Sequence, residues 1–212
     1  AYVALDDRTP AVLYKQALAN YRAGRTTRAI PLLRHVVDLA PEIPEAHYLL
    51  GLGLWDQGQP DAAVDALREA VTLSPGFAAA REALSGVLAT AGRADEHVEQ
   101  LEALAALEPD RPGRDVDLGL AYAGVGRTDM AVLALGRAVE EHPEQPLVYA
   151  ALGQVWLDIA RTTDDHIALS KALGALQSIP LATASSGTLT MLARALLLTD
   201  DTDGAVAALE RA

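Results

Sequence analysis

The chain has 212 residues, of which 50% are hydrophobic and only 4% aromatic, with no cysteine and a formal net charge of -12. The apolar content argues against a disordered chain, because it suffices to bury a core. The absence of cysteine excludes disulfides, thiolate zinc sites and cysteine nucleophiles, and the acidic balance disfavours nucleic acid as a partner. No apolar run approaches the roughly 20 residues that span a bilayer, so no membrane insertion is expected.

The dominant feature of the sequence is an internal repeat with a period of about 34 residues, within the range of roughly 20–50 residues that is typical of stacked-repeat proteins. Glycines recur at this spacing, at Gly24, Gly58, Gly92 and Gly126. Prolines recur at the same spacing, at Pro41, Pro75, Pro109 and Pro143. Apolar residues between them recur every three or four positions, which is typical of amphipathic helices, and no alternating strand pattern is present. Because glycine suits a left-handed helix end and proline cannot continue a helix, each period predicts a helix-turn-helix.

In chain order, the sequence predicts an N-terminal tail over residues 1–9 followed by six repeats. The repeats are expected at about 10–43, 44–77, 78–111, 112–145, 146–185 and 186–212. The step from Pro143 to Pro180 is longer than the earlier proline steps, which indicates a three-residue insertion near Arg161–His166. The sixth repeat stops before its closing proline, so we expect it to be truncated. Its apolar face is then expected to be exposed, with Leu192, Leu196, Val206 and Leu209.

The residues inside the second and fourth repeats follow one pattern. The second repeat carries Leu50-Gly51, Gly58, Ala63, Leu67, Ala70 and Pro75, and the fourth carries Leu118-Gly119, Tyr122, Gly126, Ala131, Leu135, Ala138 and Pro143. This pattern and its period resemble the tetratricopeptide repeat family over about residues 10–212. The resemblance implies an all-α, right-handed α-solenoid of about six repeats, whose first helices line a concave groove that takes an extended peptide or a helix.

Small residues are expected where paired helices cross, because the helices approach closely only there. Gly51, Gly119 and Gly153 fill this role in first helices, and Ala63, Ala131 and Ala168 supply small residues in second helices. The third repeat departs from the pattern. It places His97 and Leu104 where the family prefers alanine, so its helices are expected to lie further apart.

The sequence offers no catalytic constellation: it has no HExxH motif, no phosphate-binding glycine loop and no nucleophile elbow. Two acidic segments have alternative interpretations. Asp164–His166 is either a divalent metal site or a turn with a helix N-cap. Thr199–Glu210 resembles a calcium loop but has Thr199 in place of the first ligand, and the repeat explains it as a turn followed by a helix. We favour the turn in both cases, and therefore predict no enzyme activity, no cofactor and no metal.

An aromatic cluster on the first two repeats is the candidate binding site. On the resemblance, the inward positions of these first helices are Tyr14, Leu18, Tyr21, Arg22, Tyr48, Leu52 and Trp55. Tyrosine and tryptophan are common anchors in interfaces. The alternative is that the N-terminal segment or a second protomer fills the cluster.

The sequence therefore predicts a protein-interaction scaffold. The alternatives are a regulatory or docking segment of a larger protein, and an array that self-assembles into homo-oligomers through its ends. The alanine- and leucine-rich composition favours a bacterial source, and it leaves the compartment undetermined.

Overall fold

The computed structural model describes residues 9–111 and 113–212. These residues form twelve helices and no strand, as the all-α prediction requires. The predicted N-terminal tail lies outside the described residues except for Thr9, which is the N-cap of the first helix. The chain divides into two compact units, residues 1–109 and 110–212, and each is described by itself.

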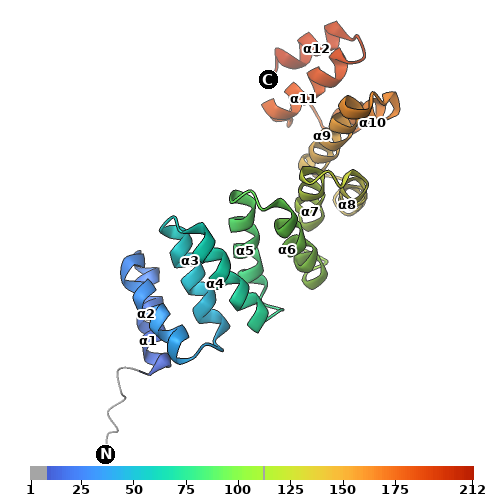
Figure 1. Ribbon diagram of the computed structural model, residues 1–212. Coiled ribbons are helices and arrows are strands. Elements are labelled where there is room, and N and C mark those ends of the chain that lie inside the picture. Colours follow the sequence, from blue (N-terminus) through green and yellow to red (C-terminus); the bar gives the residue numbers. More distant parts are fainter. Residues whose placement is uncertain (1–8, 112) are drawn as a thin grey trace, which may run out of the picture. The chain divides into compact units, whose positions relative to one another are not determined.

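The N-terminal unit consists of three helix pairs. Its helices are α1 (Pro10–Arg22), α2 (Thr26–Leu39), α3 (Pro44–Asp56), α4 (Pro60–Leu73), α5 (Ala78–Thr90) and α6 (Ala94–Leu107). Within this unit each helix packs against the next one in the chain (Figure 1). The first helices of the pairs also contact one another, α1 with α3 and α3 with α5, whereas no described second helix contacts another second helix. The first helices therefore form the inner layer of this unit.

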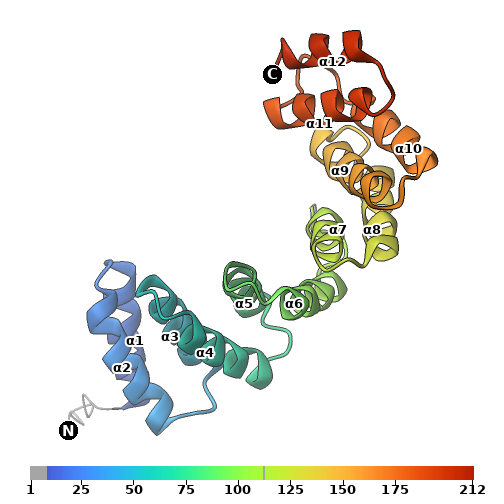
Figure 2. The same ribbon diagram turned by 45° about the horizontal axis from the view of Figure 1, so that its top comes forward.

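The C-terminal unit follows the same plan. Its helices are α7 (Arg114–Gly124), α8 (Thr128–Glu141), α9 (Pro146–Thr163), α10 (His166–Gln177), α11 (Ser186–Leu197) and α12 (Thr202–Leu209). Here α9 contacts both α7 and α11, so first helices again form the inner layer (Figure 2). Each pair buries its apolar stripe against neighbouring pairs, which is how repeat proteins gain stability that a single pair lacks.

The turn inside each pair depends on left-handed backbone. Gly24, Gly58, Gly92 and Gly126 all have φ near +70°, from 69° to 75°, at the end of a first helix. The fifth and sixth pairs use aspartate instead, Asp164 at φ 54° and Asp200 at φ 59°. Aspartate is one of the few residues other than glycine that enter this region readily.

The predicted insertion in the fifth repeat lengthens a helix. α9 has 18 residues, whereas α1, α3 and α5 have 13 each. The extra residues extend α9 by more than a turn before Asp164 reverses the chain. The partner of Gly153 is accordingly Leu176, far along α10, and Ala168 is not among its nearest neighbours.

The helix crossings are as tight as the sequence predicts. A Cβ atom added to Gly51 would lie 2.6 Å from Leu67 Cγ, and one added to Gly119 would lie 2.5 Å from Leu135 Cγ. At Gly153 the corresponding distance to Leu176 Cγ is 2.7 Å. Real Cβ atoms do not approach carbon this closely, so only glycine permits these crossings.

In the third pair, the crossing of α5 and α6 contains polar side chains instead of glycine. Ser85 replaces glycine and is buried, and its Oγ lies 2.8 Å from His97 Nδ1. The same ring nitrogen lies 3.0 Å from the Ser85 carbonyl oxygen. His97 therefore occupies the alanine position by hydrogen bonding to the facing helix, and Leu104 is buried beside it.

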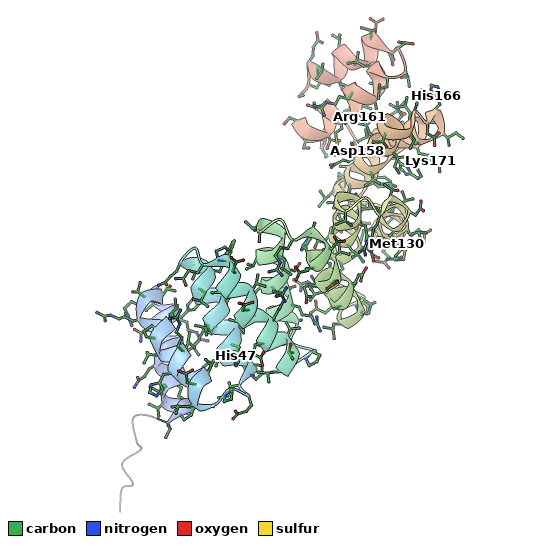
Figure 3. All side chains as sticks on the ribbon, in the orientation of Figure 1. His47, Met130, Asp158, Arg161, His166 and Lys171 are labelled. Atoms are coloured by element: carbon green, nitrogen blue, oxygen red, sulfur yellow. The ribbon has the colours of Figure 1, made fainter. Side chains whose placement is uncertain are left out.

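The connectors between pairs are held by a side chain at one repeat position. His47 Nε2 donates to the Pro41 carbonyl oxygen at 2.8 Å, and Arg81 Nε, one repeat period later, donates to the Pro75 carbonyl oxygen at 2.8 Å. Figure 3 shows His47 on α3. Pro41 and Pro75 lie just beyond the ends of α2 and α4, so each bond ties a connector carbonyl to the first helix that follows it.

Part of the expected exposure of the sixth repeat is wrong. Leu192 and Leu196 are buried, because they pack into a core with Leu157, Leu169 and Leu176 from the fifth repeat. Val206 and Leu209, on α12, are each 50% exposed, as expected. The apolar surface of this repeat is therefore confined to α12 and the end of α11.

Candidate functional site

The predicted aromatic residues lie on two adjacent helices of the inner layer. Tyr14, Leu18 and Tyr21 are spaced four and three residues apart on α1, and Tyr48, Leu52 and Trp55 repeat that spacing on α3. This spacing puts each set on one face of its helix. Because α1 and α3 contact each other, the two sets belong to one surface.

The cluster rests on the hydrophobic core while keeping part of its surface open. Tyr14, Leu18, Tyr21, Tyr48 and Trp55 are partly buried and pack against the buried core of the N-terminal unit. Leu52 is also partly buried, whereas Arg22, at the end of α1, is exposed. The rings are thus supported from beneath, which restricts their rotamers before any ligand binds.

Two of the three phenols, those of Tyr14 and Tyr21, have a raised pKa. The pKa of Tyr21 is raised to about 12, first by burial and then by the nearby Asp56 carboxylate, which accepts a hydrogen bond from the phenol. Burial also raises the pKa of Tyr14, with a second contribution from Glu45. Tyr48 contributes to both shifts. At neutral pH the site therefore presents uncharged hydroxyl groups beside two carboxylates.

Phe77 is a member of the cluster that the sequence reasoning placed in a connector. Its ring centroid lies 5.0 Å from that of Tyr48, with the planes tilted by 57°. This is a favourable geometry for an aromatic pair. Phe77 is the N-cap of α5. The sequence signal that could have identified it is its repeat position, which is occupied one period earlier by Ile43. Ile43 is the N-cap of α3 and packs, like Tyr14, against a shared core.

The two acidic segments act as helix caps. Asp165 Oδ1 accepts from the backbone N–H of Ile167 at 2.7 Å, and Asp201 Oδ1 accepts from that of Gly204 at 2.8 Å. These bonds satisfy amides at the starts of α10 and α12. Within residues 9–111 and 113–212, no cluster of three or more His, Asp or Glu side chains is arranged to hold a metal ion. Among the described helices, none combines the length and hydropathy that a membrane span requires.

The fold and the site define a class: an α-solenoid of stacked helix pairs whose first helices carry an open, partly aromatic surface. A tetratricopeptide repeat family model matches residues 14–76 and 48–112. A comparison of the sequence with curated proteins found no match.

Solved structures share the fold. YrrB, described as a tetratricopeptide repeat protein with an unusual peptide-binding site, is 16% identical with a TM-score of 0.69, and the match covers 97% of this chain and 94% of YrrB. PilF of Pseudomonas aeruginosa is 18% identical with a TM-score of 0.62, covering 96% and 89%. MamA of Desulfovibrio magneticus RS-1 is 23% identical with a TM-score of 0.62, covering 82% and 97%. Residues 14–112 therefore match the tetratricopeptide repeat family, and the solved structures share the fold of the chain.

Proposed function

We propose that the protein is an interaction scaffold that binds an extended peptide or a helix of a partner protein on the aromatic cluster of α1 and α3. The observation that carries the proposal is the set of partly buried rings on the inner layer, supported by the core beneath and open above. The structural neighbour YrrB is described as having a peptide-binding site, which is consistent with this use of the fold.

The chemistry of the cluster favours an apolar segment with hydrogen-bonding groups. Tyrosine and tryptophan bury large areas and have few rotatable bonds, so ordering them on binding costs little entropy. The phenol oxygens can accept hydrogen bonds from a partner, and Glu45 and Asp56 lie close enough to Tyr14 and Tyr21 to shift their pKa values. A partner segment with aliphatic side chains and a nearby basic group suits this surface best.

The experiment compares binding and stability in the same variants. Trp55→Ala and Tyr48→Ala should weaken capture of a partner by the immobilised protein, whereas Leu39→Ala, which alters an exposed leucine on α2, should not. Tyr48→Phe keeps the ring and its contact with Phe77, so its thermal unfolding should match the wild type. Retained capture by both alanine variants, or a large fall in melting temperature with unchanged capture, would contradict the proposal.

End-to-end association is a second candidate, favoured by the exposed apolar groups of the last pair. Leu197, Leu198, Val206 and Leu209 are each about half exposed. Light scattering over a range of concentrations tests this candidate. A mass that rises with concentration in the wild type and not in Val206→Glu would support it, and a constant monomer mass would exclude it.

A further inference from the structure

The inner layer of the C-terminal unit contains an apolar pocket that the sequence reasoning did not identify. The pocket measures about 340 Å³ and lies between α7, α9, α11 and the connector that precedes α11. Its wall includes Leu120, Leu147, Ala150, Ile179 and Met191, and no charged side chain lines it. Leu147 is 66% exposed and Leu120 is 37% exposed. The pocket therefore leaves leucine side chains in water that a ligand side chain would cover.

A second hollow of about 450 Å³ continues from the pocket along the facing sides of α9 and α11. The two share Gln154, Gly187 and Met191, so they form one groove. The second hollow carries charge: Asp158 and Arg161 on α9, and Arg194 on α11. Figure 3 shows Asp158 and Arg161 near each other on α9.

The three charges leave the groove with an excess positive charge. Arg161 Nη1 and Asp158 Oδ1 are 3.6 Å apart, so these two side chains neutralise each other. Arg194 is exposed, and within the described part of the chain no carboxylate pairs with it. A free guanidinium beside an apolar pocket, in a chain of net charge -12, is a local feature that selects a carboxylate.

We propose that this groove binds a peptide segment of a partner protein that carries an aliphatic side chain and, near it, an acidic side chain. The aliphatic group fills the pocket between Leu147 and Met191, and the carboxylate pairs with Arg194. Met191 and Arg194 are three residues apart, a rise of about 4.5 Å along α11. In an extended peptide neighbouring side chains point to opposite sides, so the nearest residue that faces the same surface is two positions away, at about 6.6 Å. The long side chain of Arg194 can cover the difference, so the acidic residue is expected two positions from the aliphatic one.

The test uses a fluorescent probe peptide with blocked termini, Gly-Glu-Ala-Leu-Ala-Glu-Gly, on the full chain. Its symmetry offers an acidic residue two positions from leucine in either chain direction, and its blocked end removes the terminal carboxylate. Saturable binding by fluorescence anisotropy is expected. Replacing the leucine of the probe by alanine, or both glutamates by lysine, should weaken binding to this groove about tenfold or more, because each change removes one of the two contacts. The lysine probe is titrated in the Trp55→Ala background, because the aromatic cluster itself suits an aliphatic segment with basic groups.

Variants of the protein locate the bound probe. Arg194→Glu should weaken binding of the acidic probe about tenfold or more and should improve binding of the lysine probe, since a charge reversal on both sides restores attraction. Ala150→Trp should block the pocket. Arg34→Glu makes the same change of charge at an exposed position of α2 and should leave binding of the acidic probe unchanged. Trp55→Ala, in the aromatic cluster, should also leave it unchanged.

Three results would overturn the proposal: no saturable binding of the acidic probe, equal binding by wild type and Arg194→Glu, or loss of binding in Trp55→Ala. The last result would assign the probe to the aromatic cluster. Circular dichroism melts of each variant accompany the titrations, and rescue of Arg194→Glu by the lysine probe excludes misfolding as the cause of its weaker binding.

Discussion

The crossing of α3 and α4 makes a quantitative prediction at Gly51. In Gly51→Ala the new Cβ would lie 2.6 Å from Cγ and 2.9 Å from Cδ2 of Leu67. Carbon atoms prefer about 3.5–4.0 Å, so the overlap is about 1 Å. Leu67 is fully buried, so its side chain cannot move out into solvent. Either its rotamer changes or the two helices separate.

The expected cost is the difference between two effects. Overpacking a core costs about 1–3 kcal/mol, while replacing a helical glycine by alanine gains about 1 kcal/mol from backbone entropy. Because this overlap is severe and involves a buried branched side chain, we expect a net loss of about 1–2 kcal/mol. For a unit of this size the melting temperature should fall by about 4–8 °C per kcal/mol.

Urea unfolding followed by tryptophan fluorescence measures this loss. In a Trp156→Phe background, Trp55 is the only tryptophan of the chain and reports on the N-terminal unit. Gly86→Ala on α5 is the matched control, because its added Cβ meets no atom within 4 Å. It should stabilise by about 0.5–1 kcal/mol. A Gly51→Ala variant as stable as Gly86→Ala would refute the steric argument.

Single side chains support three further predictions. Tyr21 should ionise near pH 12 in the folded protein, above the usual pKa of about 10, so its contribution to stability is full below about pH 10 and is lost as the pH rises towards 12. An absorbance titration against Tyr21→Phe checks this, and Asp56→Asn should lower the pKa. Asp165→Ala removes the cap of α10 and should cost about 1 kcal/mol in urea unfolding, with an unchanged midpoint as the contrary result. The Arg93 guanidinium lowers the pKa of Glu96. Ionised Glu96 therefore stabilises the fold above its usual pKa, and this contribution is lost as the pH falls. In urea unfolding, Glu96→Gln should be about 0.5 kcal/mol less stable than the wild type at neutral pH and equally stable in acid.

The sequence was most informative where sterics admit few residue types. A left-handed turn residue admits glycine and a few polar residues, and the crossing at Gly51 admits only glycine, so Gly58 and Gly51 record backbone geometry directly in the sequence. Repetition of the turn glycine and the connector proline at one constant period turned local features into a fold. The same logic placed the insertion of the fifth repeat, since its length appears as a shift in proline spacing.

Features that depend on neighbours were harder to predict. The proline spacing indicated an insertion near Arg161–His166, but only the structure shows that α9 is the helix that is longer, with 18 residues against 13 in α1, α3 and α5. Leu192 and Leu196 were expected to be exposed because no helix follows α12, yet the preceding pair covers them. The pocket beside Leu147 was missed for a similar reason: it arises from the spacing of three first helices and a connector, which no local pattern encodes.

The aromatic cluster occupies repeat positions at which the fold does not require an aromatic residue. Tyr14 and Tyr48 are one period apart, as are Tyr21 and Trp55, and one further period leads to Glu82 and Ala89 on α5. Because the third pair packs with alanine at this position, a large ring at position 55 is not needed to join two helix pairs. Burial of part of Trp55 still contributes to stability, so Trp55→Ala should lower the melting temperature while the helix content stays unchanged. The repeat does not require these rings, and we therefore propose that a ligand determines their identity, which the binding experiments on α1 and α3 test.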